Sequence, residues 1–140
     1  MPQSNHMPSA TGVRIAGDEY QWLHAWSACL QILHDQVNGT ANPGASVGVE
    51  EPGVGNGDDV VIHRAAPPHS YCQVKYTVDA STPVNSEYLN DSGVLKKLVA
   101  THQALTRDGT PCEIRLVTNR AIDPTDVLLR DRDGRDGRLV

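Results

Sequence analysis

Three polar residues near the middle of the chain have the types and spacing needed to act on a phosphate group. Asp59 adjoins a run of β-branched residues, and Gln73 and Lys75 lie two positions apart in a second strand-like run. Side chains two apart on a strand share a face, so Gln73 and Lys75 are expected side by side. If the two strands pair as a hairpin, Asp59 lies beside them. A carboxylate, an amide and an ammonium group would then converge.

Such a group is suited to binding a divalent cation for phosphodiester hydrolysis. Mg²⁺ prefers one or two carboxylates with other oxygen donors and retained water, and Mn²⁺ accepts similar ligands. Asp59 is the expected carboxylate ligand, with the Gln73 amide and the Val74 carbonyl as further donors. Lys75 would orient the attacking water or stabilise charge developing on the phosphate. Asp58 competes with Asp59, which is preferred because it directly adjoins the strand.

A first helix is predicted from Asp18 to about His34. Asp18 is followed three positions later by Gln21, a variant of the capping box. The helix is expected to be buried on more than one side because its apolar arc is broad. That arc consists of Trp22, Trp26, Cys29 and Leu33, widened by Tyr20, Leu23 and Leu30.

The rest of the pattern predicts strands, one more complete helix and connecting loops. The strands are expected at residues 47–50, 59–63, 71–77 and 112–118, with a glycine-rich hairpin loop at 51–58. A second helix opens at residues 91–93. The last strand follows a helical crossover and is therefore predicted to be parallel to its neighbour. The order is α-β-β-β-α-β, an α/β domain with a central mixed sheet flanked by helices; Asp123 and Pro124 are able to open a further helix.

Length and composition fit one domain. The chain has 140 residues, of which 39% are hydrophobic, enough for a modest core. Residues 1–13 are expected to be disordered, residues 14–130 to form the domain, and residues 131–140 to be a charged linker or a truncated tail. The N-terminus lacks the order of a secretory signal and no long apolar run is present, which predicts a cytoplasmic protein with no membrane partner.

Composition also excludes several function classes. A net charge of −5 argues against a general nucleic-acid coat protein, whose affinity comes mainly from Lys and Arg. Paired zinc ligands, a phosphate-binding Gly-rich loop and a Gly-x-Ser-x-Gly elbow are all missing from the sequence. The cysteines, all predicted to be buried reduced thiols, are Cys29, Cys72 and Cys112.

The ordered set of motifs resembles the PD-(D/E)xK, or restriction-endonuclease-like, superfamily. Asp59 followed by Gln73-x-Lys75 within this element order is similar to its Gln-x-Lys variant, as in Mrr-like nucleases. A closer similarity is to the double-stranded DNA nuclease domain of bacterial anti-phage effectors, including the endonuclease of cyclic-oligonucleotide (CBASS) defence. It spans about residues 14–130 and rests on residues 17–21, 49–50, 58–60, 71–76 and 116–120.

This resemblance implies a metal-dependent endonuclease that hydrolyses double-stranded DNA, with Mg²⁺ or Mn²⁺ as cofactor and an antiviral role. Asp59, Gln73 and Lys75 match the catalytic positions. In that family the nuclease module normally precedes sensor domains, so the expected partners are double-stranded DNA, C-terminal sensor domains and possible further copies of the chain. Lower-ranked candidates for metal or water contacts are Glu50, Glu19 and Gln21.

Two other interpretations stay open. One is a catalytically inactive nuclease-like module that binds DNA or protein, and the other is an unrelated α/β interaction domain with an acidic surface. Gln73 and Lys75 would then be the solvent face of a strand, and Glu19 and Gln21 would serve only helix capping. His63 shares the predicted face of Asp59, so it either approaches the site or lies at the surface.

Overall fold

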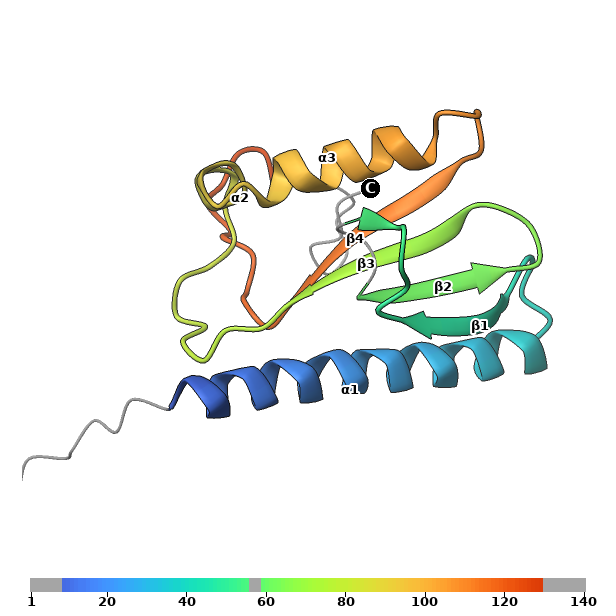
Figure 1. Cartoon of the computed structure of the whole chain (residues 1–140), viewed down its shortest axis with the longest axis horizontal. Coiled ribbons are helices and arrows are strands. Elements are labelled where there is room, and N and C mark those ends of the chain that lie inside the picture. The colour runs from blue at the N-terminus through green and yellow to red at the C-terminus, as the bar shows by residue number, and fades with distance from the viewer. Residues whose placement is uncertain (1–8, 56–58, 130–140) are drawn as a thin grey trace, which may run out of the picture.

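A four-stranded mixed sheet separates two helical layers (Figure 1). The computed structural model describes residues 9–55 and 59–129. The predicted α/β class and the α-β-β-β-α-β order are confirmed, with the short helix α2 as an addition. Along the chain the elements are α1 (Ala10–Val37), β1 (Gly44–Val49), β2 (Val60–Arg64), β3 (His69–Lys75), α2 (Ser86–Asp91), α3 (Val94–Leu105) and β4 (Cys112–Thr118).

The strands lie in the order β1-β2-β3-β4. β1 and β2 pair antiparallel, as do β2 and β3, because each pair is joined by a hairpin loop without a helical crossover. β4 pairs with β3 in parallel, as predicted, because the chain crosses over through α2 and α3 before it re-enters the sheet. In the β2–β3 pairing Val60 lies opposite Cys72. Because side chains alternate along a strand, this register decides which residues of the two strands share a face of the sheet.

Helix α1 begins earlier than the sequence predicts. Its N-cap is Ser9, whose side chain accepts a hydrogen bond from the Gly12 main-chain N–H at 3.1 Å. The predicted start at Asp18 is therefore wrong, and residues 10–13, expected to be disordered, are helical. Glycines at positions 12 and 17 have low helix propensity and weaken the sequence signal for an earlier start. The first turn is nevertheless formed, with the Val13 main-chain N–H donating to the Ser9 carbonyl at 3.0 Å. The predicted terminal segments at residues 1–8 and 131–140, together with residue 130 of the predicted domain, lie outside the described residues.

The prediction that α1 is buried on more than one side is wrong. Only the small residues Ala25 and Ala28 are buried, at 5% and 6% exposure, whereas Trp22 and Trp26 are 57% and 66% exposed. The two alanines let the helix backbone approach the sheet closely. Cys29, also expected to be buried, is exposed, while Cys72 is buried and Cys112 is half-buried.

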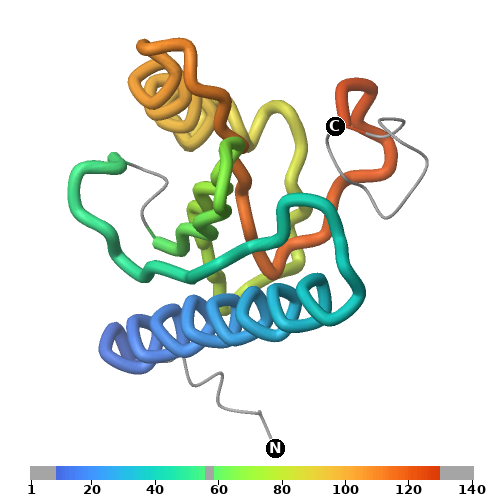
Figure 2. The backbone as a smooth tube through the Cα atoms, turned by 90° about the vertical axis from the view of Figure 1, so that its right-hand side faces the viewer, coloured from blue at the N-terminus to red at the C-terminus, as the bar shows by residue number. Residues whose placement is uncertain are grey.

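Helix α1 lies along one face of the sheet and α3 along the other (Figure 2). Each face has its own apolar core. On the α1 side, Ala25 packs against Val60 and Cys72. Valines of β1, β3 and β4 border this cluster, at positions 47, 49, 74 and 117. On the other side, residues of α2, α3 and the C-terminal segment pack together, with β4 contributing Leu116. Those buried residues are Val84, Leu89, Val94 and Leu129.

The predicted helix at Asp123 and Pro124 does not form within the described residues, where turns follow β4 up to residue 129. Ile122 instead makes an isolated parallel bridge with Val84. The Asp126 carboxylate accepts hydrogen bonds from the Ser86 main-chain N–H and hydroxyl at 2.8 and 2.7 Å. These bonds lower the pKa of Asp126 to about 2 and hold the segment against the start of α2.

His24 on α1 predicts a pH-dependent stability. Its Nε2 is buried and has no hydrogen-bond partner in the structure. Burial, and then the nearby Arg115 charge, lower its pKa from the ordinary 6.5. The unfolded chain then binds the proton more readily than the folded chain, so the free energy of unfolding falls as the pH drops below about 6.5. Urea unfolding at neutral and mildly acidic pH measures this effect.

A matched variant separates His24 from the other titrating groups. In His24→Leu the free energy of unfolding should fall less steeply than in the wild type as the pH is lowered. His102→Leu, at an exposed position of α3, should keep the wild-type slope. Equal slopes in the wild type and His24→Leu would contradict the assignment.

Candidate active site

Asp59 and Gln73 lie next to each other at one end of the β2–β3 pair. Continuing the register in which Val60 faces Cys72 places Asp59 opposite Gln73. The Gln73 side-chain amide donates a hydrogen bond to the Asp59 carboxylate, which also accepts one from the Val74 main-chain N–H at 2.6 Å. The structure thus brings together the acid and the amide that the sequence places on neighbouring strands.

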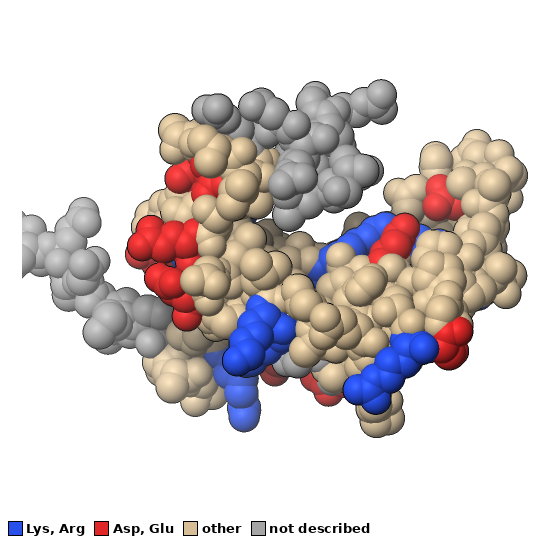
Figure 3. Space-filling view, turned by 90° about the horizontal axis from the view of Figure 1, so that it is seen from above, with Lys and Arg blue, Asp and Glu red and all other residues tan. Residues whose placement is uncertain are grey.

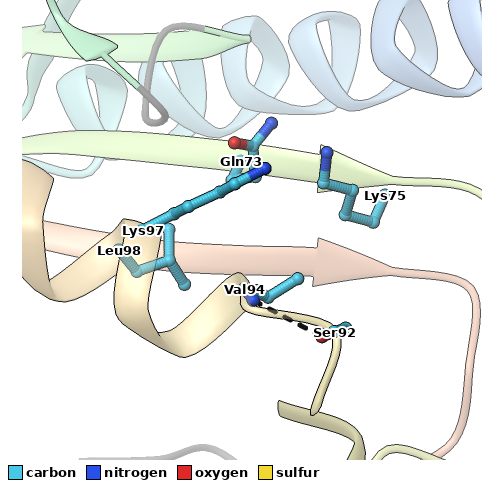
Figure 4. A pocket seen from close by; sticks show the side chains of 6 residues that line it. All are labelled: Gln73, Lys75, Ser92, Val94, Lys97 and Leu98. Carbon is cyan, nitrogen blue, oxygen red and sulfur yellow. Dashed lines mark hydrogen bonds between the residues drawn. The ribbon is translucent and has the colours of Figure 1, made fainter. Parts of the chain in front are cut away.

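Gln73 and Lys75 share the face of β3 that looks toward α3. Both line a surface pocket between the sheet and this helix (Figure 4). Gln73 is nearly buried, at 8% exposure, while Lys75 is exposed. A hydrogen-bonded amide therefore lies at the inner part of the pocket and an exposed cation at its edge. The pocket is lined by Gln73, Lys75, Ser92, Val94, Lys97 and Leu98.

Lys97 is a site residue that the sequence alone does not indicate. It comes from α3, and its side chain extends across the pocket toward Gln73 (Figure 4). A lysine on the polar side of a helix is usually a solvated surface group, so no local signal singles it out. With Lys75 it gives the pocket two cations, which favours an anionic ligand.

Residues of helix α1 and of the loop after β1 also lie near Asp59. Gln21 Nε2 donates to Glu50 Oε1 at 3.5 Å and to the Asp59 main-chain carbonyl at 3.4 Å. Glu50 has a backbone φ of 51°, in the left-handed region that residues other than glycine rarely adopt. Its main-chain N–H donates to the Asp59 carbonyl at 3.2 Å, which helps to hold this conformation. Gln21 and Glu50 therefore lie beside Asp59.

Two of the remaining candidates lie elsewhere. Glu19 is exposed on α1, nine residues and so two and a half turns before the buried Ala28, which directs it away from the sheet. His63 bonds Glu51 Oε1 at 2.6 Å near the far end of β2, about 13 Å along the strand from Asp59. Asp58 lies outside the described residues.

The donor set around Asp59 fits a hard cation that keeps most of its water. Among residues 9–55 and 59–129, no three His, Cys, Asp or Glu side chains are grouped to hold a metal, so Asp59 must act with neutral oxygen donors. The Gln73 amide and a main-chain carbonyl such as that of Val74 are of this type. Because the Gln73 nitrogen faces Asp59, the amide must turn by half a rotation to present its oxygen to the same ion.

The surroundings set the electrostatics of this corner. Cys72, on the α1 side of the sheet, is buried, and burial raises its pKa to about 11, which keeps it an uncharged thiol.

On the face seen in Figure 3, Lys and Arg side chains lie at several separate places, and acidic side chains gather at the end of the molecule that carries α2 in Figure 1. At the pocket itself the positive charge comes from Lys75 and Lys97.

Comparisons of the chain with protein-family models, with curated proteins and with solved structures gave no match. None of the helices in the described ranges is long and apolar enough to cross a bilayer. The resemblance to PD-(D/E)xK nucleases therefore stays a prediction from the chain's own motifs, and what the site does must follow from the residues that form it.

Proposed function

We propose that this chain is a metal-dependent endonuclease domain that hydrolyses phosphodiester bonds of double-stranded DNA. The observation that carries the proposal is one arrangement: Asp59 bonded to Gln73, with Lys75 two positions further on the same strand face. All three occupy one end of the sheet, where Gln73 and Lys75 line a pocket open to solvent and Asp59 is bonded to Gln73. A carboxylate, an amide and an ammonium group at such a place suit a metal-bound phosphate better than any other common substrate group.

Each residue has a role that its position supports. Asp59, the Gln73 amide oxygen and the Val74 carbonyl would hold the cation, and Glu50 and Gln21 would bind its outer water molecules. When bound, Mg²⁺ or Mn²⁺ supplies neutralisation of the phosphate and a more acidic water. Lys75 donates to the attacking water or to a phosphate oxygen. Lys97, from the opposite wall, binds a second phosphate oxygen.

The substrate and the biological role come from the resemblance to anti-phage effector nucleases. On that basis we assign double-stranded DNA as substrate, the bacterial cytoplasm as location, and a sensor-controlled defence system as context. The net charge of −5 means that long-range attraction to DNA is weak. Local contacts from the two pocket lysines, and from any partner domain, must then position the duplex.

A second candidate function is an inactive nuclease-like module that binds DNA or protein. It is favoured by the hydrogen bonds to Asp59, whose carboxylate already accepts from Gln73 and from Val74. If these bonds persist when Mg²⁺ is added, the carboxylate serves to join β2 and β3 instead of binding a cation.

Incubation of the purified chain with supercoiled plasmid separates the two functions. We expect conversion to nicked and linear DNA with Mg²⁺ or Mn²⁺, and intact plasmid when a chelator is added, because the cation neutralises the phosphate. A gel time course at several protein concentrations measures the rate. Intact plasmid under all conditions, together with a gel shift of the same DNA, would overturn the endonuclease proposal in favour of binding.

A further inference from the structure

The outward face of α1 carries a continuous apolar surface. Its seven large apolar side chains are between 49% and 77% exposed, although exposed residues of this kind usually occur singly. We call this surface the outer stripe. Its members are Ile15, Trp22, Leu23, Trp26, Leu30, Leu33 and Val37.

The outer stripe has the spacing of a helix-pairing seam. Starting at Ile15, steps of four and three residues alternate through Glu19, Trp22, Trp26 and Cys29 and end at Leu33. This is the repeat by which two α-helices pack side chains into each other along their length. A second row at seven-residue intervals, Leu23, Leu30 and Val37, widens the seam on one flank. Ala25 and Ala28 meanwhile hold the opposite side of α1 against the sheet.

We propose that a second copy of this chain covers the outer stripe, with the two α1 helices packed antiparallel. From Ile15 to Val37 the stripe is about 33 Å long. An aromatic side chain buries about 150–250 Å² in full, and Trp22 and Trp26 still expose 57% and 66% of their surface. With five aliphatic side chains beside them, the stripe offers an area of the order of the 800 Å² per partner that a specific interface needs.

The stripe is also self-complementary, as a twofold pair requires. Trp26 lies eleven residues from both Ile15 and Val37, at the middle of the stripe. Antiparallel pairing about Trp26 therefore places Ile15 of one copy level with Val37 of the other. It also sets the large Trp22 level with the smaller Leu30, while the two Trp26 side chains meet at the centre of the seam.

The terminal segments outside the described residues are poor alternatives. Residues 1–8 contribute two methionines, and residues 130–140 contribute Leu139 and Val140 among charged and glycine residues. Four apolar side chains cannot cover seven large ones.

Glu19 selects the antiparallel orientation. It is the one acidic residue within the seam. A parallel pair would place the two Glu19 side chains at the same level, where like charges repel. An antiparallel pair separates them by about fourteen residues, or 21 Å along the axis, and sets each Glu19 level with Leu33, next to the basic side chain of His34.

This pairing does not depend on the proposed nuclease activity. The outer stripe lies on the far side of α1 from the sheet, whereas the pocket with Gln73 and Lys97 opens on the α3 side of that sheet (Figures 1 and 4). Both pockets of a pair would stay open. Its test therefore uses mass and fluorescence and needs no substrate.

Sedimentation equilibrium and light scattering measure the expected assembly. We expect a species of twice the 15.1 kDa mass of one chain, dissociating on dilution. Trp26→Glu and Leu30→Glu should each weaken the dimer by at least about 30-fold, because a charge replaces a central apolar contact. Val127→Glu introduces the same charge at a position that is 74% exposed and outside α1, so it should leave the dimer unchanged.

Tryptophan fluorescence reports on the same surface, because both tryptophans of the chain lie in the outer stripe. The dimer should emit at shorter wavelength and resist acrylamide quenching, and Leu30→Glu should abolish both effects. A monomer at every concentration, an assembly larger than two, or equal weakening by Val127→Glu would overturn the proposal. Binding of a monomeric chain to lipid vesicles through the stripe would also overturn it.

Cross-linking tests the orientation in a Cys29→Ser background. A mixture of Ile15→Cys and Val37→Cys chains should cross-link readily with a short bis-maleimide, and Ile15→Cys alone should not. The reverse result would show parallel pairing and overturn the antiparallel arrangement.

Discussion

Replacing Lys75 with alanine is expected to slow metal-dependent plasmid cleavage by at least about 100-fold, the usual cost of removing one group that stabilises charge in a transition state. Lys75 is exposed and two residues from Gln73 on the same strand face, so its loss should remove charge without unfolding the chain. Asp59→Asn should have an effect of the same size, since it removes the carboxylate expected to hold the cation. Initial rates of plasmid nicking measure both.

The two neighbouring lysines of α3 provide the control for this experiment. Lys97 lines the pocket and Lys96 does not, although both are exposed. Lys97→Ala should therefore raise the protein concentration needed for cleavage, and Lys96→Ala, with the same loss of charge, should behave like the wild type. A wild-type rate for Lys75→Ala in a preparation that cleaves plasmid would show that Lys75 has no part in the chemistry.

Replacing Ala25 with leucine is expected to lower the free energy of unfolding by about 1–3 kcal/mol, the typical cost of forcing extra methylenes into a packed core. Ala25 is 5% exposed and packs between α1 and the sheet against Val60 and Cys72. A larger side chain must push the helix away from these residues or adopt a strained rotamer. Urea unfolding followed by circular dichroism measures the loss.

Ser27→Leu is the matched control, because it adds the same side chain at an exposed position of α1 two residues away. It should change stability by no more than about 0.5 kcal/mol. Measuring both changes in a Leu30→Glu background removes any contribution of helix pairing at the outer stripe. If Ala25→Leu is as stable as Ser27→Leu, the helix is not held closely by its two alanines.

The candidate site shows where prediction from sequence works and where it stops. The common face of Gln73 and Lys75 follows from the two-residue period of a strand, and the place of Asp59 beside Gln73 follows once β2 and β3 pair as a hairpin. The choice between Glu19 and Gln21 depends on the rotation of α1 about its axis. Lys97 enters the pocket only because the crossover packs α3 over β3.

By itself, the sequence determined the features that depend on near neighbours: the α/β order, the strand at residues 112–118, its parallel pairing with β3, and which side chains share a face. Only the tertiary structure decided which face of α1 meets the sheet. A helical repeat groups side chains into faces, but the free energy that chooses among those faces comes from partners distant in the chain. Here two small alanines, which allow close approach, were preferred over the tryptophans, and so the most apolar side of α1, with Cys29, was left facing outward.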